Sequence, residues 1–175
     1  MNKLLSISKG IKYFVDLCVD ISFWGAMILL LLLGPVAFYE VIVRKIGHPT
    51  SWTFTVLTYM ELIIIWLGVA YTQKVRGHVN VDIIVMHLPR TAQVVVRIFA
   101  YTLSSVVVFI LMWETFVMVL RSYTLDLRTT EEFLHPIWWI QVPTLVGSVL
   151  LFLVLVCQVC SDVYSLAKME GDSKE

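Results

Sequence analysis

The segment RGHVNVDIIVMHLP, residues 76–89, carries two histidines, an arginine and an aspartate that could do chemistry, and it joins two apolar stretches. Its two histidines, His78 and His87, lie nine positions apart with no third ligand nearby. A zinc site requires four ligands, or three and a water molecule. The segment therefore gives little support to a metal site.

Haem and thiol chemistry are also poorly supported. Membrane bundles that hold haem place histidines on facing helices, whereas the four histidines here lie in connections outside the apolar stretches: His48, His78, His87 and His135. Cys157 and Cys160 form a C-x-x-C, the spacing of thiol redox pairs. They fall within a continuous apolar stretch on the predicted reducing side, and we expect them to be small packing residues.

Acidic residues inside the apolar stretches are more informative, because a charge near the membrane centre costs about 2.5 to 3.5 kcal/mol on insertion scales. Glu40 precedes Arg44 by one helical turn, which predicts an ion pair on one helix face. Glu61 lies about 13 Å along a helix from Trp52, near the middle of the membrane, and Glu114 is about 10 Å deep.

No lysine or arginine of the predicted spans can reach Glu61. We therefore expect this carboxyl group to be protonated, to face a wet crevice or to pair with another chain. Proton-coupled small multidrug exporters use such a glutamate for exchange, and this function is the main alternative. Those exporters have minimal loops, however, whereas residues 74–97 and 121–136 form long connections here.

The elements that carry these residues are predicted to be membrane-spanning helices. The chain of 175 residues is 59% hydrophobic and only 15% charged, and about 20 apolar residues cross a bilayer as a helix. Lipid offers no partner to backbone groups, so each span must be helical. We predict an all-α integral membrane protein, a single domain over residues 1–175, with transmembrane helices at residues 21–43, 53–73, 98–120 and 137–161.

The segments outside the spans suggest an orientation. Residues 1–20 resemble an amphipathic arm on the membrane surface, with a frayed start of the first span as the alternative, and residues 162–175 form a tail. The arm, the central connection and the tail hold nine lysines and arginines, against four on the other side. The positive-inside rule therefore places both termini in the cytoplasm. The pairs Gly34–Pro35 and Pro143–Gly147 predict kinks.

From residue 52 onward the chain resembles the small membrane subunit of tripartite ATP-independent periplasmic (TRAP) transporters, the DctQ family. The resemblance rests on a tryptophan that opens the second span, a Leu-Gly pair, a basic patch, an H-V-x-V-D motif and a Leu-Pro pair, at Trp52, Leu67, Gly68, Lys74, Arg76, His78, Val79, Val81, Asp82, Leu88 and Pro89. One departure is that Phe54 and Thr55 occupy positions where the family often has two acidic residues.

The resemblance implies a function in which this chain is neither an enzyme nor the transport pathway. Members of the family serve sodium-driven uptake of organic acids such as dicarboxylates or sialic acid. A periplasmic binding protein captures the substrate, and a large multi-span subunit moves it with sodium. The small subunit is a scaffold in the bacterial inner membrane, with lipids as neighbours, no cofactor of its own and no nucleic-acid partner. An anchor subunit of a redox complex remains a further alternative.

Three sets of candidate residues follow. We expect the large subunit to contact Glu61, Glu114, Trp52 and Gly68. We interpret Arg76, His78 and Asp82 as a cytoplasmic elbow at the membrane surface, with structural and not catalytic roles. The longer outer loop offers charges for docking of the binding protein, at Asp126, Arg128, Glu131 and Glu132.

Overall fold

Four long helices make up the computed structural model, which describes residues 2–47, 50–75, 90–129 and 135–172. They are α1 (Asn2–Lys45), α2 (Ser51–Lys74), α4 (Arg90–Thr124) and α5 (Trp138–Asp172). Each contains a stretch that is long and apolar enough to cross a membrane: Lys12–Lys45, Trp52–Lys74, Ala92–Thr124 and Trp138–Leu166. The predicted all-α fold with four transmembrane helices is confirmed.

The helices extend beyond the spans predicted from the sequence. α1 continues without a break through residue 20, so residues 2–20 and the first span belong to one helix. α5 likewise continues past residue 161 to Asp172. A helix does not end where the apolar stretch ends, because its backbone bonds are internal and polar residues can extend it into water. The surface position of the N-terminal arm stays a prediction.

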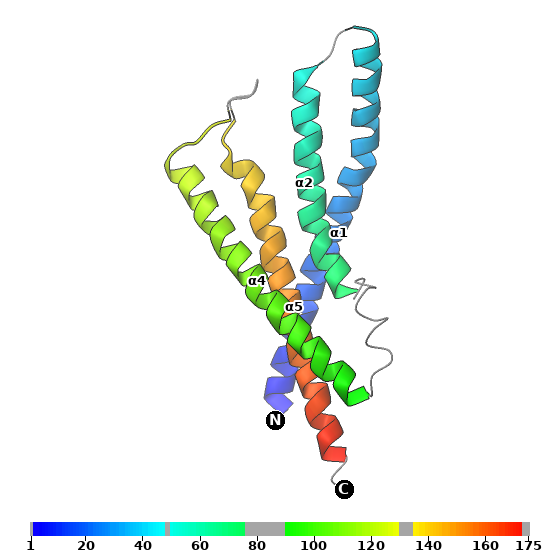
Figure 1. Ribbon diagram of the computed structural model, residues 1–175, viewed down its shortest axis with the longest axis vertical. Helices are drawn as coiled ribbons and strands as arrows, with labels where there is room; N and C mark the ends of the chain where they lie inside the picture. Colours follow the sequence, from blue (N-terminus) through cyan, green and yellow to red (C-terminus); the bar gives the residue numbers. More distant parts are fainter. Residues whose placement is uncertain (1, 48–49, 76–89, 130–134, 173–175) are drawn as a thin grey trace.

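The helices form two antiparallel hairpins, α1–α2 and α4–α5 (Figure 1). Both termini lie at one end of the molecule, which we call the inner end, and the two shorter connections lie at the opposite, outer end (Figure 1). α5 packs against α4 on one side and α2 on the other, and it also contacts α1. Placement of the inner end in the cytoplasm stays a prediction.

A small apolar core joins three of the helices. It consists of Val15 and Val19 of α1, Ala70 of α2, and Leu150 and Val154 of α5. The ring of Phe23 adds to the α1–α2 contact by stacking on Tyr71, with 3.8 Å between ring centroids. Residues of the predicted N-terminal arm therefore belong to the core.

The hairpins approach each other closely at Gly147 of α5. A Cβ atom at this position would lie 2.2 Å from the backbone oxygen of Trp66 in α2. Only glycine permits this approach, as is common where membrane helices cross closely. The sequence grouped Gly147 with Pro143 as a kink element, and the structure shows that its role is packing against α2.

α4 buries only one narrow stripe. Val94, Val108 and Ser122 are buried at intervals of 14 residues, and Tyr101 and Thr115 between them are half-buried. This seven-residue repeat is the pattern of a helix that packs along a single partner, and that partner is α5. Most of the remaining circumference of α4 is exposed and apolar.

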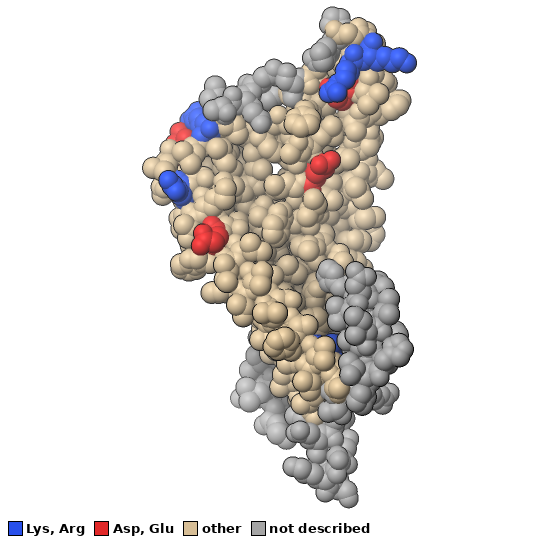
Figure 2. Space-filling model, viewed as in Figure 1, with Lys and Arg blue, Asp and Glu red and all other residues tan. Residues whose placement is uncertain are grey.

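The outer surface is apolar over most of its area. In the view of Figure 2, charged side chains occupy a few separate places in a surface that is otherwise uncharged. A water-soluble protein rarely exposes apolar patches of this extent, because they mark contact with lipid or with another protein. The surface thus fits a chain whose surroundings are a bilayer and partner subunits.

Candidate functional site

One face of α2 is turned away from the rest of the chain. Phe54, Thr58, Glu61 and Ile65 are exposed and recur at intervals of three or four residues, which places them on one helix face. The exposed fractions of Phe54 and Ile65 are 69% and 65%. We call these four residues, together with Gly68, the α2 outer stripe.

Glu61 lies at the centre of the α2 outer stripe. In the part of the chain that the structure describes, no hydrogen bond or ion pair reaches its carboxyl group. Thr58, one turn before it, donates its hydroxyl hydrogen bond to the backbone oxygen of Phe54 at 3.0 Å. Since the Thr58 hydroxyl is already bonded, the Glu61 carboxyl group is the one side-chain group of the stripe that is available to a partner molecule.

Gly68 and Trp52, the other candidates on α2, differ in their surroundings. A Cβ atom at Gly68 would meet nothing within 4 Å, so the helix surface there is open to a neighbour. Trp52 lies nine residues before Glu61, on the opposite side of the helix, and its ring centroid is 6.3 Å from that of Tyr39 in α1. The structure therefore joins Glu61 with Gly68 and separates both from Trp52.

Glu114 gives α4 a similar exposed acidic group. It is the one acidic residue of α4, as Glu61 is of α2. Figure 2 shows acidic side chains over both helices on a single face, with uncharged surface between them. Within the described ranges Glu114 has no hydrogen-bonding or ionic partner. α2 and α4 thus each carry one exposed acidic group that has no partner among the described residues.

Glu40, by contrast, is buried and fully paired. Arg44 donates a hydrogen bond to its Oε1 at 3.2 Å, which confirms the predicted pair. Thr50 donates its hydroxyl to Oε2 at 2.6 Å, and a second short hydroxyl contact of 2.6 Å joins Thr50 to Thr53. Thr50 occupies the N-cap position of α2, but its side chain binds Glu40 and makes no cap hydrogen bond. The network closes the outer end of the α1–α2 hairpin.

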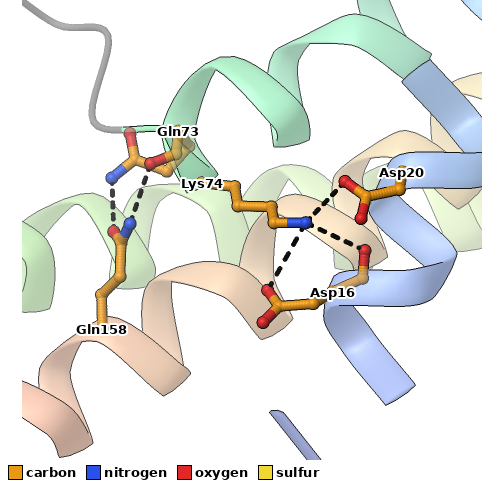
Figure 3. Close-up of polar contacts among 5 residues, drawn as sticks. All are labelled: Asp16, Asp20, Gln73, Lys74 and Gln158. Carbon is orange, nitrogen blue, oxygen red and sulfur yellow. Dashed lines mark hydrogen bonds and ion pairs between the residues drawn. The ribbon is translucent and has the colours of Figure 1, made fainter. Parts of the chain in front are cut away.

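The inner end holds a polar cluster that the sequence did not predict (Figure 3). The Lys74 ammonium at the end of α2 donates to Asp20 Oδ1 at 2.5 Å and to the backbone oxygen of Asp16 at 3.2 Å. The carboxylate of Asp16 is 3.9 Å away. Asp16 and Asp20 are one turn apart on α1, and this pair of like charges on one face was the available signal for a nearby cation.

Two further pairs of residues join the helices at this end. Gln73 of α2 donates to the side-chain oxygen of Gln158 in α5 at 2.7 Å, and Gln158 donates to the backbone oxygen of Gln73 at 2.8 Å (Figure 3). Arg97 of α4 lies 3.7 Å from the buried carboxylate of Asp162 in α5. Polar contacts therefore link α1 to α2, α2 to α5 and α5 to α4. We call these contacts the inner-end ties.

Backbone hydrogen bonds join the described residues of the outer loop. The Leu127 amide donates to Ser122, the Ile137 amide to Leu127, and the Thr129 amide to His135. Asp126 and Arg128 form an exposed ion pair at 2.9 Å, so these two predicted docking charges balance one another. The docking candidates Glu131 and Glu132 lie outside the described residues, as do the elbow residues Arg76, His78 and Asp82.

A family comparison identifies the chain. Residues 33–164 match the model of the DctQ component of tripartite ATP-independent periplasmic transporters. The chain belongs to this DctQ family. No individual curated protein matches it. The family is a transporter component of the inner membrane and not an enzyme family.

As a DctQ component, the chain is the small membrane subunit of a TRAP transporter, a family whose members associate with a large subunit and a binding protein. The matched range contains Glu61, Glu114 and Lys74 but begins after Asp16 and Asp20. The two α1 aspartates that contact Lys74 therefore lie outside the range that the family model matches.

Metal and thiol sites add nothing to this assignment. In residues 2–47, 50–75, 90–129 and 135–172, no three histidine, cysteine or acidic side chains lie together as metal ligands would. Cys18, Cys157 and Cys160 are free thiols. The exporter and redox-anchor alternatives are therefore set aside by the family assignment, and no contact in the described residues favours them.

Proposed function

We propose that the chain is the fixed scaffold of a sodium-coupled importer of organic acids, of the dicarboxylate or sialic-acid type. The large multi-span subunit carries substrate and sodium, and this chain binds that subunit in the plane of the membrane. A periplasmic binding protein delivers the substrate and contacts the outer loop. No cofactor or ion is assigned to this chain.

The observation that carries the proposal is the α2 outer stripe. An exposed carboxyl group within an apolar span is costly in lipid, and a hydrogen-bond donor or a cation on a neighbouring helix offsets that cost. Gly68, two turns further along the same face, allows a neighbouring backbone to approach closely. Both features fit a partner helix packed along α2, and neither is used by the described residues of this chain.

Co-purification with a tagged large subunit tests this assignment. Glu61→Lys and Gly68→Leu should each lower the recovered complex at least about tenfold, since a buried unpaired charge or a steric clash in an interface costs several kcal/mol. Glu61→Gln keeps the hydrogen bonding and should retain the complex. Gly34→Leu is the matched control, because Gly34 also has open space around it. Equal recovery for Gly68→Leu and Gly34→Leu would place the interface elsewhere.

Reconstitution separates the scaffold from a transporter in its own right. In liposomes, sodium-dependent uptake should require the large subunit, the binding protein and this chain together. Glu61→Gln should retain most of that uptake, because the amide keeps the size and the hydrogen-bonding capacity of the side chain but cannot carry a proton in exchange. Solute flux driven by this chain alone, or complete loss of uptake in Glu61→Gln, would instead support proton-carrying transport.

The outer loop provides a separate test of binding-protein docking. Arg128→Glu places two negative charges next to each other and should weaken docking at low salt but much less at high salt, because exposed charges are screened within about 10 Å at 0.1 M. The exchange of both residues, Asp126→Arg with Arg128→Asp, keeps the net charge and serves as the control. Docking that is insensitive to both variants would remove this loop from the interface.

A further inference from the structure

A pocket opens at the inner end between α1, α2 and α5, with a volume of about 220 Å³. Its polar lining comes from Lys12 and Asp16 of α1, Lys74 of α2, and Gln158 and Ser161 of α5. Binding sites for drug-sized ligands have volumes of roughly 300 to 1,000 Å³. This pocket is suited to a smaller polar group.

The depth of the pocket is set by where the apolar spans end. Lys12 begins the first span and Lys74 ends the second. The valine side chains of Val15 and Val154 form the apolar part of the lining and belong to the core. The pocket therefore lies at the level where polar headgroups meet hydrocarbon chains, the level at which lysine contacts lipid phosphates.

The charges around the pocket are mixed. Lys74 is held by Asp16 and Asp20, so much of its charge is already balanced. Lys12 is exposed, and among the described residues no ion pair is formed with it. Asp16 also lines the pocket and has two oxygens that accept hydrogen bonds. The lining thus offers one available cation, one carboxylate, an amide and a hydroxyl.

We propose that this pocket binds the headgroup of a zwitterionic aminophospholipid. The phosphate contacts Lys12 and the hydroxyl of Ser161, and the primary ammonium donates hydrogen bonds to the carboxylate of Asp16. The anionic headgroup of phosphatidylglycerol offers Asp16 only neutral hydroxyl donors, which bind more weakly than an ammonium, and Asp16 and Asp20 repel its net negative charge. A quaternary choline ammonium has no N–H to donate. The charge pattern therefore favours ethanolamine over both.

Native mass spectrometry of the full chain tests this proposal. Phosphatidylethanolamine, phosphatidylcholine and phosphatidylglycerol with identical acyl chains are added to the protein in detergent. We expect one phosphatidylethanolamine to be retained about tenfold more than either of the others, since a charge-assisted hydrogen bond differs between them. Equal retention of the three lipids, or preference for phosphatidylglycerol, would overturn the proposal.

Matched variants locate the bound lipid. Lys12→Glu removes the contact to the phosphate and should abolish the retention of phosphatidylethanolamine, whereas Lys45→Glu, the same change on an exposed lysine at the other end of α1, should preserve it. Ser161→Leu fills the pocket without altering the ties to Lys74 and should also reduce retention. Thermal unfolding of each variant verifies that it is folded. Retention of phosphatidylethanolamine that survives both Lys12→Glu and Ser161→Leu in folded protein would contradict this site.

The source of the headgroup is tested by competition. Water-soluble glycerophosphoethanolamine shares the headgroup chemistry but has no acyl chains. Millimolar concentrations should leave the bound phosphatidylethanolamine in place, because the acyl chains contribute most of the affinity of a membrane lipid. Displacement by the soluble compound would identify a free phosphoethanolamine ester as the ligand and overturn the assignment to lipid.

Discussion

The inner end of the molecule and the α2 outer stripe differ in whether the charged groups have partners within the described chain. At the inner end, Lys74 and Arg97 meet carboxylates of other helices, so polar groups hold the bundle together. On the α2 outer stripe, Glu61 has no partner within the described chain. The comparison teaches that a charge in a membrane protein stabilises the fold only where the same chain provides its partner.

The largest expected effect concerns the close approach of the two hairpins at Gly147. Gly147→Ala places a Cβ atom against the Trp66 carbonyl and forces α2 and α5 apart, which should lower the free energy of unfolding by about 2 to 3 kcal/mol. The measurement is chemical or thermal unfolding in detergent. Gly34→Ala, at a position with open surroundings, is the control. Equal stability of both variants would mean that the hairpins are not packed closely at Gly147.

A smaller effect of opposite sign is expected at Glu61. Glu61→Leu removes an acidic group from an apolar surface, and it should raise the stability of the isolated chain in a bilayer nanodisc by about 1 to 2 kcal/mol. The same variant should weaken the complex with the large subunit, because the partner loses its acceptor. Reduced stability of the isolated chain would indicate that Glu61 serves the fold, and the contrast with the inner end would fail.

The smallest expected effect is at Lys74. Lys74→Met leaves Asp16 and Asp20 adjacent without their cation and should cost about 1 kcal/mol, because the carboxylates are partly solvated. The additional change Asp20→Asn should recover part of this loss in a double-mutant cycle. Lys45→Met, on an exposed lysine that forms no ion pair with the described residues, is the control. Zero coupling between positions 20 and 74 would remove this contact from the inner-end ties.

The sequence predicted the elements well because their signal is local. Four apolar stretches predicted the four helices, and the four-residue spacing of Glu40 and Arg44 predicted their ion pair. The sequence did not predict the inner-end ties, because Lys74 and Asp20 are 54 residues apart and Gln73 and Gln158 are 85 apart. Contacts at such separations depend on how each helix is rotated against its neighbours.

The candidate site was predicted only in part for the same reason. Glu61 and Gly68 were both singled out, and their spacing of seven residues placed them on one face. Trp52 was grouped with them although it contacts α1, because nothing in a uniformly apolar span indicates which side faces another helix. The interface, elbow and docking assignments stay predictions, and the roles of residues 76–89 and 130–134 lie outside the described structure.

The seven-residue repeat of buried positions on α4 also restricts how this helix can change length. A strict repeat of this kind causes two helices to wrap around each other with a left-handed twist. At 3.6 residues per turn, seven inserted residues before Val108 would rotate the rest of the stripe back by only about 20°, whereas four would advance it by about 40°. The packing of α4 against α5 therefore tolerates insertions of seven residues in α4 better than insertions of other lengths. An insertion of another length would also turn Glu114 towards a different side of the helix.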